Sequence, residues 1–274
     1  MKETVLIERP EAGLVRVILN KPETGNAYDD EMICTLVTAL DDLADDPTLK
    51  LVWLSGRGAH FCSGPDRQWL ARREGVGRAE HRQDAEQMSR LLETLYQLPV
   101  PILLTLRGDV NAFAVGITCC CDMVLASEKT SFCITESLFG QVPALSSPYL
   151  SKALGERSAK YYSLSGEVMD AYTATRLGLV HRLVPADELE PVATVLVQSI
   201  LTRSTESLRV TRATFNLVAN EPYDEALIET MIECSTDVRL LQSDMLKRRM
   251  TRHNGSETPA NADNHDASES ECSD

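Results

Sequence analysis

The 274-residue sequence lacks long hydrophobic runs and the short motifs of common cofactor sites. No apolar stretch approaches the roughly 18 residues that cross a bilayer, so we expect no membrane span. The motifs GxGxxG, GxxxxGK(S/T), GxSxG and HExxH are absent, which argues against a dinucleotide fold, a P-loop, a nucleophile elbow and a zinc-protease helix. The net charge of −14 disfavours nucleic acid as a partner.

The eight cysteines include no CxxC pair, and the N-terminal residues show no signal-peptide core. We therefore expect a cytoplasmic protein without a disulfide framework. Three cysteines adjoin at 119–121. Adjacent side chains diverge on a helix or a strand, so these thiols cannot converge on one metal ion. They are predicted to be small core residues, with no metal site.

Hydrophobic periodicity predicts an α/β protein whose strands dominate early and whose helices dominate late. Residues 4–20 indicate a hairpin, and acidic residues 251–274, without large aliphatic side chains, indicate a disordered tail. Buried strands are predicted at 49–56 and 100–106, a further strand at 122–127 and a short strand at 131–137. The helices are predicted at 29–46, 80–98, 148–154, 156–165, 170–177, 186–202, 205–219 and 223–249.

Two loops follow buried strands, where α/β proteins tend to bind ligands. The first is HFCSGPD (60–66) and the second is GDVNAFAVG (108–116). Residues 112–121 are small and apolar enough for a buried helix, whose free N–H groups would suit a developing oxyanion. An ordinary core helix is the alternative on this segment alone.

The series LNKPETGNA, HFCSGPD, GDVNAFAVGITCCCD and FCITESLFGQVPA resembles the crotonase (enoyl-CoA hydratase/isomerase) superfamily over about residues 3–250. The resemblance implies a spiral of β-β-α units at 1–200. It also implies C-terminal helices at 201–250 that assemble a homotrimer or hexamer, with the tail at 251–274 beyond them.

The resemblance also implies an acyl-thioester ligand whose oxygen is held by the backbone N–H groups of Ser63 and Phe113. The family's usual glycine run is replaced here by Ala112-Phe113-Ala114. A conformation that only glycine holds would then be lost. Three outcomes stay open for Phe113: its ring reshapes the acyl pocket, its ring packs in the core beside an intact oxyanion hole, or the hole collapses.

The resemblance places one catalytic carboxylate at Glu136, whereas the family's other glutamate falls at Gly116. One carboxylate can activate water in one direction and protonate the leaving hydroxyl in the other. Apolar neighbours of Glu136 are expected to raise its pKa. The local sequence alone would indicate a surface glutamate at a strand end.

The stretches RGDVNA (107–112) and ESLFGQVPA (136–144) are similar to 3-methylglutaconyl-CoA hydratases, our first choice. They are also similar to 3-hydroxy-3-methylglutaryl-carrier-protein dehydratases of polyketide β-branching. We therefore predict a hydro-lyase (a lyase) for a branched acyl thioester, without a cofactor. Its substrate would be carried on CoA or on an acyl carrier protein. Another crotonase reaction, such as isomerisation or decarboxylation, and a non-catalytic thioester-binding paralogue are the alternatives.

A distal carboxylate on that substrate needs a cationic partner, and the loop after HFCSGPD offers Arg67, Arg72 and Arg73. These arginines could instead be solvated, touch CoA phosphates or receive a carrier protein. Asp66 is expected to anchor the loop, and His60 is expected to be structural.

Overall fold

The computed structural model describes residues 3–254 of the chain, which divide into two compact units, the first ending at Glu221 and the second beginning at Pro222. The first unit contains both sheets and the helices as far as α9. The predicted boundary at residue 200 falls within the last turn of the helix Leu189–Leu201, and the first compact unit extends to Glu221. Within residues 3–254, no helix is both long and apolar enough to cross a membrane.

The first unit contains a six-stranded sheet of order β1-β2-β3-β4-β6-β9 and a small sheet of order β5-β7-β8. β1 and β2 form the predicted antiparallel hairpin, and from β2 to β9 the larger sheet is parallel. The strands are β1 (Val5–Glu11), β2 (Leu14–Leu19), β3 (Leu51–Gly56), β4 (Ile102–Leu106), β5 (Asp109–Asn111), β6 (Met123–Ser127), β7 (Ser131–Cys133), β8 (Met169–Asp170) and β9 (Arg182–Val184).

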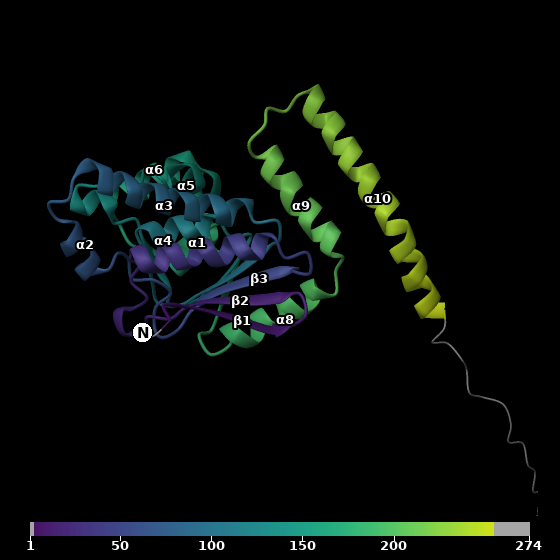
Figure 1. Ribbon diagram of the computed structural model, residues 1–274, viewed down its shortest axis with the longest axis horizontal. Helices are drawn as coiled ribbons and strands as arrows, with labels where there is room; N and C mark the ends of the chain where they lie inside the picture. Colours follow the sequence, from purple (N-terminus) through teal and green to yellow (C-terminus); the bar gives the residue numbers. More distant parts are fainter. Residues whose placement is uncertain (1–2, 255–274) are drawn as a thin grey trace, which may run out of the picture. The chain divides into compact units, whose positions relative to one another are not determined.

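Helices cover both faces of the larger sheet. In Figure 1, α1, α3 and α4 lie over one face and α8 lies under the other. The helices are η1 (Pro22–Thr24), α1 (Asp30–Ala44), α2 (Arg67–Arg73), α3 (Arg78–Gln97), α4 (Phe113–Cys119), η2 (Glu136–Phe139), α5 (Ser147–Leu154), α6 (Glu156–Ser165), α7 (Ala171–Arg176), α8 (Leu189–Leu201), α9 (Thr205–Val218) and α10 (Glu225–Asn254). The α/β prediction is confirmed.

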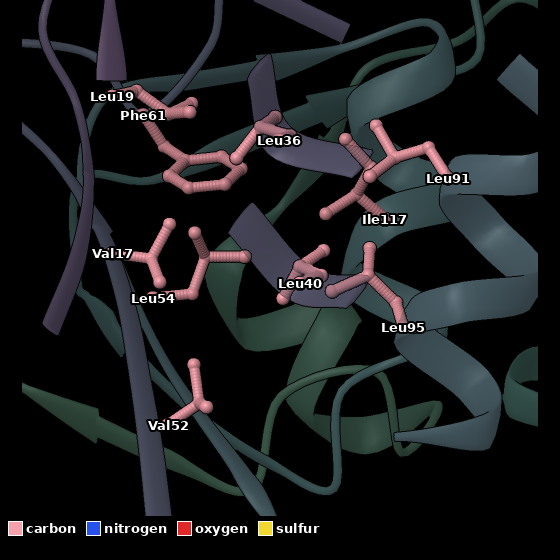
Figure 2. Close-up of a pocket in the computed structure, with 10 residues that line it drawn as sticks. All are labelled: Val17, Leu19, Leu36, Leu40, Val52, Leu54, Phe61, Leu91, Leu95 and Ile117. Atoms are coloured by element: carbon pink, nitrogen blue, oxygen red, sulfur yellow. The ribbon is translucent and has the colours of Figure 1, made fainter. Parts of the chain in front are cut away.

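The main core lies between the larger sheet and the helices α1, α3 and α4. Figure 2 shows strand side chains such as Val17 and Leu54 facing Leu40 of α1, Leu95 of α3 and Ile117 of α4. Only about 10 Å³ of free space remains there, and the lining is entirely apolar. Interiors are close-packed in this way, so this gap is a packing feature of the core.

The structure corrects two sequence predictions about segments. Residues 67–73 form helix α2 instead of a loop, because the Asp66 carboxylate accepts hydrogen bonds from the N–H groups of Gln68 and Trp69 and caps that helix. The predicted tail begins inside α10, which continues to Asn254. The rest of the tail, 255–274, lies outside the described residues.

Candidate active site

A cleft of about 740 Å³ opens where α2, α3, the start of α4 and the segment after β7 meet. Its lining combines aromatic and apolar side chains with a few titratable groups, as ligand sites commonly do. The lining residues are Tyr28, Pro65, Trp69, Leu70, Arg73, Glu74, His81, Asp84, Ala85, Met88, Phe113, Glu136, Gln141, Val142, Pro143, Ala144, Leu145 and Ser146.

Glu136 is half-buried on the cleft wall and begins η2, so it does not end the preceding strand as a surface residue. Its Oε2 is buried and, within residues 3–254, has no hydrogen-bond partner. Burial raises the pKa of Glu136, and its own backbone N–H only partly opposes that rise. The expected upward direction of the shift is confirmed, and a carboxyl in this setting suits proton transfer.

Phe113 is the first residue of α4 and is 2% exposed. The ring packs edge-on against Tyr28, with 5.7 Å between centroids, and also lines the cleft. Ala112 before it adopts φ 54° and ψ −129°, a conformation that favours glycine. The expected loss of that conformation is therefore wrong: alanine holds it, at a cost of about 1–3 kcal/mol.

Gly116 lies in the interior of α4, where no side chain fits. A Cβ built there would come within 2.4 Å of Ser146 Oγ and 2.9 Å of Ser146 Cβ. Ser146 is itself buried and lines the cleft. Position 116 therefore brings the backbone of α4 close to the cleft wall and leaves Glu136 without a carboxylate partner from this helix.

Ser63 does not offer the free N–H that the resemblance implied. Its N–H donates to the Gly25 carbonyl oxygen at 2.9 Å, and its Oγ donates to the Thr24 carbonyl oxygen at 2.9 Å. These contacts fasten the HFCSGPD loop to the LNKPETGNA loop. A thioester oxygen would have to displace a formed backbone hydrogen bond to use this donor.

The predicted anchoring role of Asp66 agrees with its contacts, because it caps α2 and lies 3.5 Å from Lys21 Nζ. Desolvation raises the pKa of Asp66, but the Trp69 and Gln68 N–H groups and Lys21 together lower it below its ordinary value. Lys21 also pairs with Asp29, which caps α1. His60 Nδ1 accepts a hydrogen bond from the Asp109 N–H, which joins the two predicted loops.

Of the three candidate arginines, only Arg73 lines the cleft. Arg67 is exposed on α2, and Arg72 is exposed beside Asp30. Arg73 donates to Asp84 at 2.8 Å and to Asp30 at 3.3 Å. Its Nε is buried without a partner within residues 3–254. The proposed contact with a substrate carboxylate thus falls to Arg73 alone.

Two aromatic residues of the site, Tyr28 and Trp69, were not predicted. Tyr28 is 7% exposed and packs between Trp69 and Phe113. Trp69 is 6% exposed, and its Nε1 has no partner within residues 3–254. The spacing of Asp66 and Trp69 matches an N-cap followed by an inward-facing first turn, a signal that could have located α2 and its tryptophan.

The three adjoining cysteines pack in or against the main core, as predicted. Cys120 is buried, and the Cys121 thiol donates to the Ile117 carbonyl oxygen. Burial raises the pKa of Cys119 to about 12, which keeps it a thiol. In the described part of the chain, no three His, Cys, Asp or Glu side chains gather as a metal site would require.

Comparison with known proteins gives consistent matches over most of the chain. The profile of the family described as "Enoyl-CoA hydratase/isomerase" matches residues 9–250. A putative enoyl-CoA hydratase of Thermus thermophilus is 36% identical over 203 residues, covering 74% of this chain and 80% of its own. The mitochondrial enoyl-CoA hydratase domain-containing protein 3 of Rattus norvegicus is 29% identical over 210 residues, covering 76% and 68%.

A solved structure supports the same relationship. A putative enoyl-CoA hydratase/isomerase (crotonase) from Legionella pneumophila superposes with a TM-score of 0.85 at 26% identity, covering 94% of this chain and 98% of that one.

Proposed function

The chain belongs to the enoyl-CoA hydratase/isomerase family and has the crotonase fold, and we propose that it adds or removes water across C2–C3 of an acyl thioester. The observation that carries this proposal is Glu136. It is a half-buried carboxyl with a raised pKa and an unpartnered oxygen, on the wall of a cleft of substrate size.

In the hydration direction, Glu136 takes a proton from water while the water oxygen bonds to C3. The C2–C3 double-bond electrons move toward the thioester and negative charge builds on its oxygen. The acid form of Glu136 then gives its proton to C2, which regenerates the carboxylate. In the dehydration direction, the Glu136 carboxylate takes the C2 proton, and its acid form then protonates the departing hydroxyl, which leaves C3 as water. The thioester oxygen would lie beside Phe113, where hydrogen-bond donors can stabilise its developing charge.

For the acyl group, we propose a branched 3-methylglutaconyl or 3-hydroxy-3-methylglutaryl type, carried on CoA or on a carrier protein. Arg73 supports this choice, because its buried Nε is an unused donor beside the cleft. The Trp69 indole N–H is a second unused donor on the same helix. A substrate carboxylate that reached these donors would satisfy them, whereas a purely apolar acyl chain would leave both unpaired.

The test is turnover, followed by mass spectrometry, of 3-hydroxy-3-methylglutaryl attached to CoA or to a carrier protein. The wild-type protein is expected to remove water from one of these two thioesters. Glu136→Gln is expected to lower kcat by a factor of about 10²–10⁴. Glu156→Gln is the matched control, because Glu156 is an exposed glutamate of α6 paired with Lys160. Full turnover by Glu136→Gln would refute the role of Glu136.

The panel also includes thioesters that can only isomerise or decarboxylate. A product of unchanged mass from an enoyl thioester would identify an isomerase. Thioester binding without turnover of any member would contradict a catalytic role.

A further inference from the structure

We propose that the Tyr28 hydroxyl donates a hydrogen bond to the thioester oxygen. It would take the role that the resemblance assigned to the Ser63 N–H. This inference rests on the proposed function, because it concerns the same thioester and the same cleft. It adds a catalytic residue that lies outside the segments HFCSGPD, GDVNAFAVG and FCITESLFGQVPA.

A side-chain donor is needed because the backbone at the mouth of the cleft offers little. The Ser63 N–H already donates to Gly25. Pro65, which lines the cleft two residues later, has no N–H at all. The HFCSGPD loop therefore shapes this wall, but neither Ser63 nor Pro65 offers a free N–H to a ligand.

Tyr28 is fixed beside the HFCSGPD loop, whose Ser63 N–H is already paired. Its backbone N–H donates to the Gly64 carbonyl oxygen at 3.0 Å, and its carbonyl oxygen accepts from the Asp66 N–H at 2.8 Å. Its ring packs edge-on against Trp69 and Phe113, with centroid distances of 5.9 and 5.7 Å. A ring held on both sides keeps its hydroxyl in one place, so the donor is preorganised.

The hydrogen-bond direction around this hydroxyl suits a donor. A hydrogen bond from the Phe113 backbone opposes the rise in the pKa of Tyr28, and a hydroxyl that accepts one hydrogen bond can still donate its proton to another acceptor. A donor that itself accepts a hydrogen bond is strengthened, and an O–H group bonded to a developing oxyanion is a charge-assisted pair. The polarity of the Phe113 N–H would thus reach the substrate through Tyr28.

The hydroxyl also keeps its proton over the whole working range of pH. Burial raises the pKa of Tyr28, with Cys62 and Glu136 adding to the rise and the Phe113 N–H opposing it. Tyr28 therefore acts by hydrogen bonding, and proton transfer stays with Glu136.

The experiment compares Tyr28→Phe, which removes only the hydroxyl, with Tyr149→Phe. Tyr149 is a matched control, because it is also packed edge-on, against Tyr96, and does not line the cleft. Tyr28→Phe is expected to lower kcat by about 10²–10³ with little change in KM. Tyr149→Phe is expected to retain wild-type kcat.

A second measurement separates this inference from the proposed function. Butanoyl-CoA labelled with ¹³C at the thioester carbonyl binds without reacting, and infrared difference spectra report how strongly that carbonyl is polarised. The carbonyl band should move to lower wavenumber on wild type, Glu136→Gln and Tyr149→Phe, and should move clearly less on Tyr28→Phe.

Each other outcome has a definite meaning. An unchanged band shift with Tyr28→Phe, or a kcat equal to or above that of wild type, would overturn the role of Tyr28. A higher kcat would show that the hydroxyl blocks the site. No binding or band shift with wild type itself would overturn the proposed thioester site and this inference with it.

Discussion

Ala112 holds a backbone conformation that an alanine rarely adopts, immediately before the candidate site. Its φ of 54° lies in the region that favours glycine. Ala112→Gly should relieve strain of about 1–3 kcal/mol and cost about 0.5–1 kcal/mol in chain entropy. We therefore expect the free energy of unfolding in urea to rise by about 1 kcal/mol.

The matched control is Ala114→Gly, two residues later and buried inside α4. An ordinary helical alanine should lose about 1 kcal/mol on the same change. Equal losses for both variants would show that Ala112 is not strained.

Glu136 should make stability depend on pH with a defined sign. The pKa of Glu136 is raised in the folded state. Well below its ordinary value of 4.5 the carboxyl is protonated in both the folded and the unfolded protein, so its burial does not lower the stability. The cost grows as pH rises through the folded-state pKa. Glu136→Gln should therefore raise Tm at pH 7 and leave it nearly unchanged near pH 4.

The control Glu156→Gln should show no such gain, because the hydrogen bond from Lys160 lowers the pKa of Glu156. Melting curves of the three proteins at both pH values test this prediction. A Tm gain for Glu136→Gln that is larger at pH 4 would contradict it. In the hydration direction, kcat of wild type should rise with pH through the same raised pKa.

At the scale of the elements, Arg212 of α9 joins helices that are distant in sequence. It donates to both carboxylate oxygens of Asp122, at 2.8 and 3.0 Å, and to the carbonyl oxygens of Leu95, Tyr96 and Leu98 at the end of α3. The last carbonyls of a helix need such donors. These contacts group α9 with the first unit.

Arg212→Met should lower the free energy of unfolding by about 3–5 kcal/mol, because it removes the cationic partner of Asp122 and the donor to the Leu95 and Leu98 carbonyl oxygens. Arg203→Met is the control: Arg203 is an exposed arginine after α8, and its loss should change stability by less than about 0.5 kcal/mol. Urea denaturation followed by circular dichroism measures both. Similar stabilities for the two variants would show that Arg212 does not hold α9 in place.

Hydrophobic periodicity predicted most helices and strands, because their buried positions recur along the sequence with the period of the element. The face of α1 that carries Ile33, Leu36 and Leu40 is buried as expected. Helix α2 was missed because seven residues give too short a pattern and three of them are arginines. The catalytic position of Glu136 was predicted from a motif. The hydrogen bond from the Ser63 N–H could not be predicted, because its acceptor, the Gly25 carbonyl oxygen, lies in a separate loop.

At the scale of the whole first unit, several exposed apolar side chains lie on η2, α6 and α7 and in the segments beside them. η2 contacts α6, and Leu138 lies against Gly166 after that helix. Large exposed apolar patches mark interaction sites. These exposed side chains, together the apolar surface of this unit, are Leu138, Phe139, Val142, Tyr161, Leu164, Val168 and Tyr172.

We propose that this surface is covered by further copies of the chain in the homotrimer or hexamer that the resemblance implies. Wild type should then have three or six times the protomer mass of 30.3 kDa in light scattering. Leu164→Glu should dissociate it, because an 80%-exposed leucine would become a buried, unpaired charge. Val195→Glu, on exposed α8 beneath the larger sheet, should not.

The same surface carries Leu138 and Phe139 on η2, the short helix that begins at Glu136. Assembly would therefore hold the segment that positions the catalytic carboxyl. Leu164→Glu should lower kcat per protomer although Leu164 is absent from the cleft lining. When the wild-type protein is diluted, its specific activity should fall at the concentrations where light scattering shows that the assembly dissociates. A monomeric wild type, or a dissociated Leu164→Glu with full activity, would contradict this coupling between assembly and site.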